Sequence, residues 1–132
     1  MLTVEEFDKL QKVENSKNIA VDFDGVIHKS SKGYHDGTIY DEPIDGAKEA
    51  LQKLSEKNRV ILYTCKARSD RALVNGKTGT ELVWDWLEKH GMSQYVAEVT
   101  AEKPRALVYI DDRAIEFRNW DSCFDKLEKM FG

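Results

Sequence analysis

Two aspartates one residue apart, Asp22 and Asp24, follow a short apolar run and precede Gly25. Side chains alternate between the two sides of a strand, so we expect both carboxyl groups on one side and Phe23 on the other. Two like charges held this close are costly unless a cation lies between them or one carboxyl group keeps its proton. Glycine lets the chain turn away, so the sequence predicts that the pair is presented at the carboxyl end of a strand, where open α/β sheets bind ligands.

Polar side chains also lie next to later apolar runs. Thr64 ends the second run, and Asp111 and Asp112 end the fourth. Lys103 precedes the fourth run. Each feature alone is typical of turns, strand caps or solvated surface charge. Together, at the ends of parallel strands, they would meet at one edge of a sheet.

The segment 21–26, Val-Asp-Phe-Asp-Gly-Val, resembles the first motif of the haloacid dehalogenase (HAD) superfamily, an apolar strand followed by Asp-x-Asp-Gly. Thr64, Lys103 and the pair Asp111 and Asp112 are similar to the second, third and fourth motifs of that superfamily. All four occur in the expected order and span the chain apart from its N-terminal leader. The resemblance implies a HAD-like hydrolase; the competing interpretation is a small α/β domain whose carboxylates merely cap strands.

The resemblance implies phosphoryl transfer at the first pair of acids. Asp22 would be the nucleophile that attacks a phosphoryl group and forms an aspartyl-phosphate. Asp24 would protonate the leaving oxygen and then activate the water that hydrolyses the intermediate. Asp111 would bind Mg²⁺ together with an Asp22 oxygen and the backbone carbonyl of Asp24, and Asp112 would be a supporting or alternative metal ligand.

Two further roles follow from the same resemblance. Thr64 would donate a hydrogen bond to a phosphoryl oxygen, and Lys103 would balance charge on that group and on Asp22. Superfamily members that cleave carbon–halogen bonds often lack the second acid of the first motif. Asp24 therefore favours a phosphatase.

The spacing of the motifs leaves no room for a large cap domain, because about 40 residues separate Asp24 from Thr64 and about 39 separate Thr64 from Lys103. The chain thus resembles the small capless members of the superfamily, which tend to act on large substrates or to borrow a lid from a partner subunit. Lys66, Arg68 and the nearby Arg71 would form a cationic rim for a second phosphate or a nucleic-acid end, or they are simply solvated.

The expected partner is a phosphorylated substrate, either a small molecule or a nucleic-acid end. The leading hypothesis is a Mg²⁺-dependent phosphatase of undefined substrate. One alternative is a polynucleotide-end or nucleotide phosphatase. An alternative of another class is a non-catalytic phosphate-binding or assembly module that keeps the fold.

Apolar periodicity predicts an α/β protein in which strands and helices alternate, a Rossmann-like three-layer α/β/α sandwich around a central parallel sheet. The expected strands are 18–21, 59–63, 95–100 and 107–110. The expected helices are a leader at 1–15 with Thr3 as N-cap and Glu6 at the capping-box position, one from Pro43 to about Lys57, one from Gly79 or Thr80 to Gly91, and one containing Phe124, Leu127 and Phe131. Residues 27–41, rich in Gly, Ser, Lys and Tyr, are expected to form a mobile flap beside the acids.

Composition limits the remaining possibilities. A chain of 132 residues with 41% hydrophobic residues suits one domain, 1–132. Its net charge of -4 gives no basic footprint for general nucleic-acid binding. No apolar run approaches the ~20 residues of a membrane span, so we expect a soluble, cytoplasmic protein without a membrane partner, as a monomer or homodimer. Cys65 and Cys123 fit neither a zinc site nor a disulfide framework and are expected to be free thiols.

Overall fold

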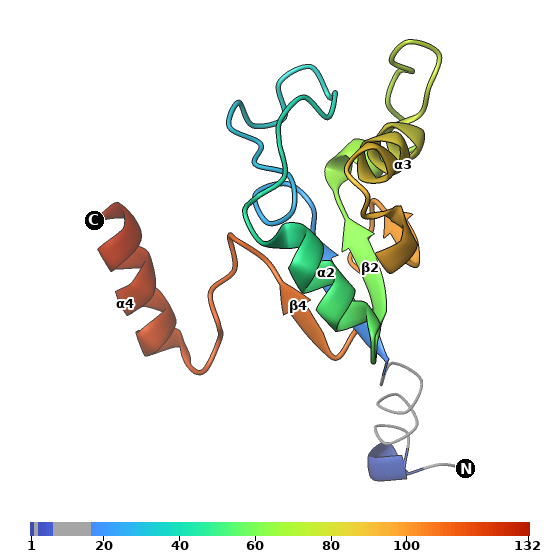
Figure 1. Cartoon of the computed structure of the whole chain (residues 1–132). Helices are drawn as coiled ribbons and strands as arrows, with labels where there is room; N and C mark the ends of the chain where they lie inside the picture. Colours follow the sequence, from blue (N-terminus) through green and yellow to red (C-terminus); the bar gives the residue numbers. More distant parts are fainter. Residues whose placement is uncertain (2, 7–16) are drawn as a thin grey trace.

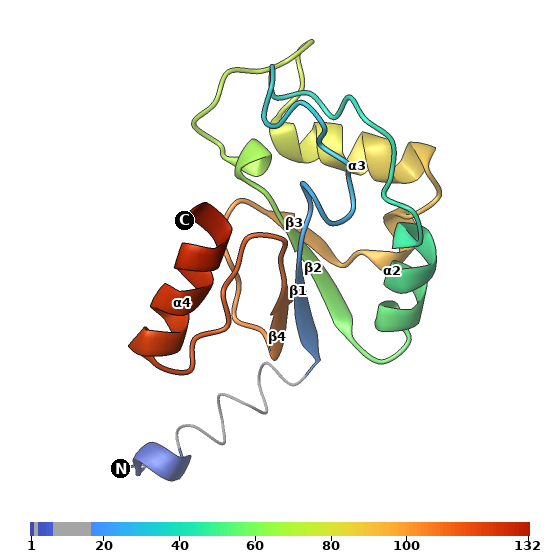
Figure 2. The ribbon, with the colours of Figure 1, turned by 90° about the vertical axis from the view of Figure 1, so that its left-hand side faces the viewer.

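Four parallel strands form the centre of the protein. The computed structural model describes residues 1, 3–6 and 17–132. The strands are adjacent in the order β3-β2-β1-β4, and each pairs in parallel with its neighbour (Figure 2; β2 and β4 are also labelled in Figure 1). They are β1 (Asn18–Asp22), β2 (Arg59–Tyr63), β3 (Glu98–Thr100) and β4 (Val108–Ile110). The predicted α/β class and the all-parallel sheet are therefore confirmed.

Helices separate the first three strands along the chain. Within residues 17–132, the α-helices are α2 (Ala47–Ser55), α3 (Gly79–Lys89) and α4 (Trp120–Phe131). The short 3₁₀ helices there are η1 (Cys65–Ala67) and η2 (Ser93–Tyr95). Helix α2 crosses from β1 to β2, and α3 crosses from β2 to β3 (Figure 2). All four strand ends therefore point the same way, which brings the residues after them to one edge.

Two predicted boundaries were wrong. Pro43 does not begin a helix, because it forms a β-bridge with His28. The helix starts only after Gly46, whose φ of +85° is not α-helical. The third strand begins at Glu98 because η2 takes up residues 93–95 as a tight turn. By contrast, β2 has the predicted bounds, and α3 begins at Gly79 behind a capping box made by Thr78 and Glu81.

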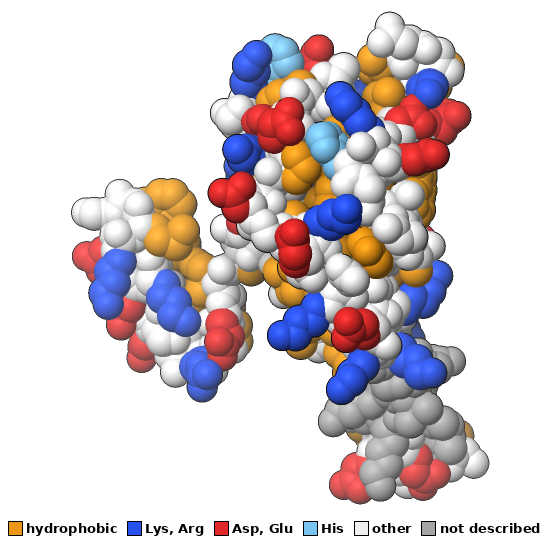
Figure 3. Space-filling view, viewed as in Figure 1, with side chains coloured by type: hydrophobic (Ala, Val, Ile, Leu, Met, Phe, Trp, Pro, Cys, Tyr) orange, Lys and Arg blue, Asp and Glu red, His pale blue; other side chains and the backbone are white. Residues whose placement is uncertain are grey.

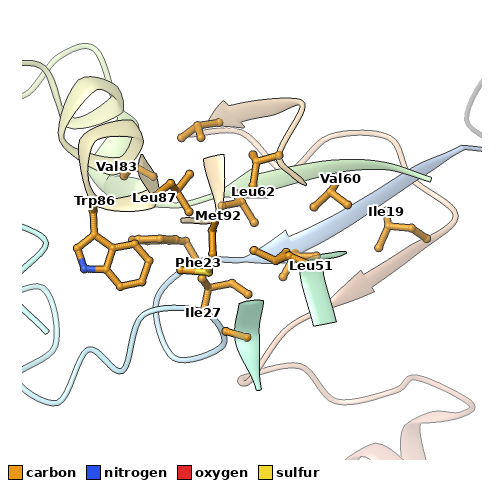
Figure 4. Packing of buried hydrophobic residues seen from close by; sticks show 14 residues of the cluster. Ile19, Phe23, Ile27, Leu51, Val60, Leu62, Val83, Trp86, Leu87 and Met92 are labelled. Carbon is orange, nitrogen blue, oxygen red and sulfur yellow. The ribbon is translucent and has the colours of Figure 1, made fainter. Parts of the chain in front are cut away.

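The core lies on one face of the sheet. Pairing of Ile19 with Val60 and of Val21 with Leu62 puts these alternate strand residues on the same face. Buried side chains of α2 and α3 pack against them in one cluster (Figure 4), among them Leu51, Val83, Trp86 and Leu87. Phe23 meets the edge of the Trp86 ring at a centroid distance of 5.2 Å. This apolar layer fixes β1 and β2, the two strands that carry the first site residues.

Helix α4 stands apart from this core (Figure 1). None of its residues is buried, and aromatic side chains such as Trp120, Phe124 and Phe131 are exposed. Apolar surface is visible on α4 in the space-filling view, where basic and acidic side chains are otherwise interspersed (Figure 3). All three residues of β4 are also exposed. The core therefore has helical cover from α2 and α3, and α4 adds none to it.

The N-terminal leader is described only in its first turn. There the backbone N–H of Glu6 donates to the Thr3 hydroxyl at 3.1 Å, as predicted for an N-cap at Thr3. The rest of the predicted leader helix, residues 7–15, lies outside the described residues. In the part of the chain that is described, no helix has the length and apolar character needed to cross a membrane. Cys65 and Cys123 are free thiols, as predicted.

Candidate active site at the carboxyl edge of the sheet

Three carboxyl groups converge where the adjacent strands β1 and β4 end. Asp22, Asp111 and Asp112 each offer an oxygen atom, and these atoms all lie within 4.8 Å of one another. Gly25 makes the approach possible: its φ is +87°, and a Cβ atom there would lie 2.1 Å from Oδ2 of Asp112. The glycine that follows the first acidic pair is therefore needed both for the turn and for space beside Asp112.

The electrostatics of this cluster are unfavourable for three free carboxylates. Burial, a hydrogen bond with Asp112 and the charges of Asp111, Asp112 and Asp24 raise the pKa of Asp22 to about 8. Asp111 is stabilised in its ionised form, because the Tyr63 hydroxyl donates to it at 2.6 Å and the Arg113 backbone N–H adds a second bond; both lower its pKa. Asp22 therefore keeps a proton at neutral pH unless positive charge arrives, mainly because of burial and the acids after β4; its sequence neighbour Asp24 contributes least.

Asp24 has a different environment, although it also lines the site cavity. Its carboxylate accepts hydrogen bonds from Nζ of Lys66 at 3.0 Å, from the Thr64 hydroxyl at 2.7 Å and from Nδ1 of His28 at 3.0 Å. The His28 tautomer is fixed by its other nitrogen, because Nε2 accepts the backbone N–H of Asp41 at 3.0 Å. Three donors, one from the flap and two from the turn after β2, thus hold one carboxylate.

These donors determine the protonation state of Asp24. Burial alone would raise the pKa of Asp24, but the hydrogen bonds from His28, Thr64 and Lys66 outweigh it and lower the pKa to about 2. Asp24 is therefore ionised at neutral pH. That is the form of a general base that accepts a proton from water; protonating a leaving group requires the other form.

The two lysines predicted near the chemistry lie in different places. Lys66 is fully buried, and its Nζ also donates to the carbonyl oxygen of Thr38 at 3.2 Å. Lys103 is exposed, with Nζ 4.4 Å from the centroid of the Tyr109 ring. Within the described residues, no hydrogen bond or ion pair links Lys103 to Asp22. The ammonium group in contact with a site carboxylate is that of Lys66.

The predicted cationic rim is not assembled. Lys66 points inward, Arg68 pairs with Asp70 through two hydrogen bonds, and Arg71 donates to the backbone carbonyls of Lys66 at 3.0 Å and Gly37 at 3.2 Å. The Arg68 pair is exposed, so substrate binding by Arg68 stays a prediction. Arg71 instead joins the loop after β2 to the flap.

A cavity of about 440 Å³ lies beside the acids. Its lining includes Asp22, Asp24 and Thr64, together with Lys29 and Tyr34 of the predicted flap. The flap is tied to itself, since the Ser31 hydroxyl and backbone N–H both donate to Asp41. Within the predicted flap 27–41, Lys29, Ser30, Gly33 and Tyr34 line the cavity with the carboxylates, and the mobility of the flap stays a prediction.

Sequence reasoning did not single out Tyr63, and it considered His28 only as a flap residue that could contact a leaving group, not as a partner of Asp24. Strand pairing could have identified Tyr63, because it is opposite Asp22 in the β1–β2 register and so shares a face with it. His28 follows a turn and forms a β-bridge with Asp24, an arrangement for which no periodic signal exists. Lys66 was selected for an exposed rim, and only the fold shows that it turns toward Asp24.

The donor set fits a hard divalent cation. Asp22, Asp111 and Asp112 present only carboxylate oxygens, which suit Mg²⁺ or Ca²⁺ and offer nothing to a metal that prefers nitrogen or sulfur. The Asp24 carboxylate is already occupied by its three hydrogen-bond donors. A metal role for the backbone carbonyl of Asp24 stays a prediction.

Comparison of the chain with protein-family models, with curated proteins and with solved structures finds no match. What the site can do is therefore inferred from its residues and their geometry.

Proposed function

We propose that this protein is a Mg²⁺-dependent phosphomonoesterase that works through an aspartyl-phosphate. The observation that carries the proposal is the convergence of Asp22, Asp111 and Asp112 within 4.8 Å at the carboxyl edge of a parallel sheet. The adjacent Asp24, held by Thr64 and Lys66, supports it further. With the order of the sequence motifs, these contacts favour a HAD-like fold of the capless type, with the three-layer α/β/α sandwich as its proposed complete architecture.

In the proposed first step, Asp22 would have released its proton to solvent on cation binding, and an oxygen of the ionised carboxylate attacks the phosphorus atom of the substrate. The bond from phosphorus to the leaving oxygen breaks, and that oxygen takes up a proton, which Asp24 supplies when it carries one. Asp22, Asp111 and Asp112 would hold Mg²⁺, which offsets the negative charge of the carboxylates and of the phosphate when bound. Charge balance from Lys103 stays part of the proposal.

In the proposed second step, water hydrolyses the intermediate. The water oxygen attacks phosphorus, the bond from phosphorus to Asp22 breaks, and the Asp24 carboxylate accepts the proton that the water loses. The ionised Asp24 described above has the protonation state that this step needs. Thr64 is adjacent to both Asp24 and the cavity, so its hydroxyl is available to a phosphoryl oxygen if it turns from Asp24.

Hydrolysis of an aryl phosphate tests the proposal. Wild type, Asp22→Asn and Asp125→Asn are compared with Mg²⁺ and with EDTA; Asp125 is an exposed aspartate of α4 and serves as the matched control. We expect Mg²⁺-dependent turnover that Asp22→Asn reduces at least about a thousandfold and Asp125→Asn leaves unchanged.

Turnover that survives EDTA, or full activity of Asp22→Asn, would contradict the aspartyl-phosphate route. A folded wild-type protein that binds Mg²⁺ but turns over neither the aryl phosphate nor a panel of phosphometabolites and phosphorylated oligonucleotides would instead support the non-catalytic phosphate-binding module.

A further inference from the structure

An aromatic side chain, that of Tyr34, lines the cavity beside the acids and contacts Arg71. Tyr34 lines the cavity, and 49% of this large side chain is exposed. The guanidinium carbon of Arg71 lies over its ring, 5.5 Å from the centroid. A cation over one face of an aromatic ring is attracted to it. Arg71 therefore backs one face of the Tyr34 ring, and Tyr34, about half exposed, is among the residues that line the cavity.

Arg71 itself has little freedom. Its two terminal nitrogens donate to the carbonyls of Lys66 and Gly37, one on the loop after β2 and the other on the flap. Gly37 gives it room, since a Cβ atom there would lie 2.2 Å from an Arg71 nitrogen. The Gly37 N–H in turn donates to the Tyr34 carbonyl at 2.9 Å. Contacts through Gly37 thus hold Tyr34 and Arg71 in one arrangement.

The rest of the lining restricts what a ligand can be. The acids Asp22 and Asp112 line the cavity, and so do the cationic residues Lys29 and Arg113. Ligand pockets of about 300–1,000 Å³ hold small molecules, so about 440 Å³ suits one compact ligand. A ligand that uses all these groups has a phosphate at the acids and a planar ring at Tyr34.

We propose that the substrate is a nucleotide bearing a terminal phosphomonoester, whose base stacks on Tyr34 while its phosphate reaches Asp22. This inference rests on the proposed function for the reaction, but recognition of the base depends on Tyr34 and Arg71 alone. Stacking on an aromatic side chain tolerates every base, because every base has a π-face. A free mononucleotide and the terminal nucleotide of a strand share this chemistry.

The test compares two substrates that differ by the base. Values of kcat/KM are measured for adenosine 5′-monophosphate and ribose 5-phosphate with wild type, Tyr34→Ala and Tyr34→Phe. We expect wild type to prefer the nucleotide by about tenfold or more, in line with the usual contribution of base stacking. Tyr34→Ala should lower kcat/KM for the nucleotide about tenfold more than for ribose 5-phosphate, and Tyr34→Phe, which keeps the ring, should retain the preference. A 5′-phosphorylated oligonucleotide cleaved in place of the mononucleotide would assign the substrate to strand ends.

Binding separates this inference from the proposed function. Adenosine 5′-monophosphate and ribose 5-phosphate are titrated with Mg²⁺ into Asp22→Asn and into Asp22→Asn/Tyr34→Ala by calorimetry. Binding that favours the nucleotide and needs the Tyr34 ring supports the inference even if wild type hydrolyses nothing, in which case the phosphatase proposal fails alone. Equal affinity for both ligands, or equal loss for both in the double variant, overturns the stacking site whatever the turnover.

Discussion

At the scale of single residues, the most constrained group of the site is Lys66. Burying an ammonium group is costly unless it is paired and hydrogen-bonded, and Lys66 is fully buried. Its Nζ contacts the Asp24 carboxylate and the Thr38 carbonyl, and lies 5.3 Å from the centroid of the Tyr40 ring. Lys66 therefore acts as a positioning residue for Asp24, a role that the superfamily resemblance does not assign to it.

Replacing each lysine by methionine tests which one serves the reaction. Lys66→Met leaves Asp24 with two donors instead of three, so we expect kcat to fall about 10- to 100-fold, the range typical of disturbed acid–base catalysis. Lys103→Met should change kcat less than about fivefold, because the Lys103 side chain is exposed and its charge lowers the pKa of Asp111 only through space, without a hydrogen bond to a described site carboxylate.

The measurement is steady-state kinetics with Mg²⁺, accompanied by thermal unfolding and circular dichroism to confirm that each variant is folded. Lys66→Arg, which keeps the positive charge, should recover part of the lost kcat. If Lys66 only filled space, Lys66→Arg and Lys66→Met would have the same kcat. A larger loss of kcat in Lys103→Met than in Lys66→Met would return the charge-balancing role to Lys103.

At the scale of elements, the start of α3 supports the turn that carries Thr64 and Lys66. The Thr78–Glu81 capping box fixes where α3 begins, and Gly79 lies directly against η1. A Cβ atom on Gly79 would lie 1.5 Å from the carbonyl oxygen of Lys66, a distance that no side chain can occupy. The close approach of α3 to η1 therefore requires glycine at this position.

Gly79→Ala is expected to destabilise the protein although alanine is the better helix former. In an exposed helix the change would gain up to about 1 kcal/mol. Here the added methyl group must displace the Lys66 backbone, so we expect a net loss of about 1–3 kcal/mol in the free energy of unfolding, with reduced kcat.

Gly46→Ala is the control. The φ of Gly46 is +85° and no atom lies within 4 Å of the added methyl group, so this change should lower the free energy of unfolding by about 1 kcal/mol without loss of kcat. Urea unfolding gives both values, and a Gly79→Ala protein that is as stable as wild type would refute the close contact.

The elements show which features a sequence can reveal. Short apolar runs predicted the strands, and the helical spacing of apolar residues predicted α3 with a start at Gly79 or Thr80, because both patterns depend on neighbours in the chain. The contacts that complete the site join distant residues: Lys66 to the Thr38 carbonyl and Arg71 to the Gly37 carbonyl. Such contacts depend on how the flap packs against the loop after β2, which no local pattern encodes. The acids were predictable because parallel strands align their ends, and the cations around them were not.

At the scale of the whole molecule, the parallel sheet concentrates negative charge at one edge. Neighbouring strands end together, so Asp22 of β1 meets Asp111 and Asp112 after β4. The core packs on β1 and β2, and β4 is joined to this edge by its pairing with β1. Folding therefore brings mutually repelling carboxyl groups together. As a result, the free energy of unfolding depends on the binding of protons and metal ions to these groups.

Without metal, the stability of the protein should fall as the pH rises. The pKa of Asp22 is about 8 in the folded protein and 3.8 in an unperturbed chain. Between these values the folded state holds a proton that the unfolded state has released, so the free energy of unfolding decreases from about pH 4 to about pH 8 and levels off outside that window. Asp22→Asn removes the titrating group but keeps a similar shape. We expect the melting temperature of wild type in EDTA to drop by roughly 5 °C or more between pH 5 and pH 8, relative to Asp22→Asn. Because both proteins retain Asp24, Asp111 and Asp112, the difference isolates Asp22.

Mg²⁺ should raise the wild-type melting temperature more at pH 8 than at pH 5, since the proton competes with the metal at the lower pH. Parallel pH profiles of the two proteins in EDTA would show that Asp22 is already ionised without a cation and that the edge of the sheet tolerates its charge.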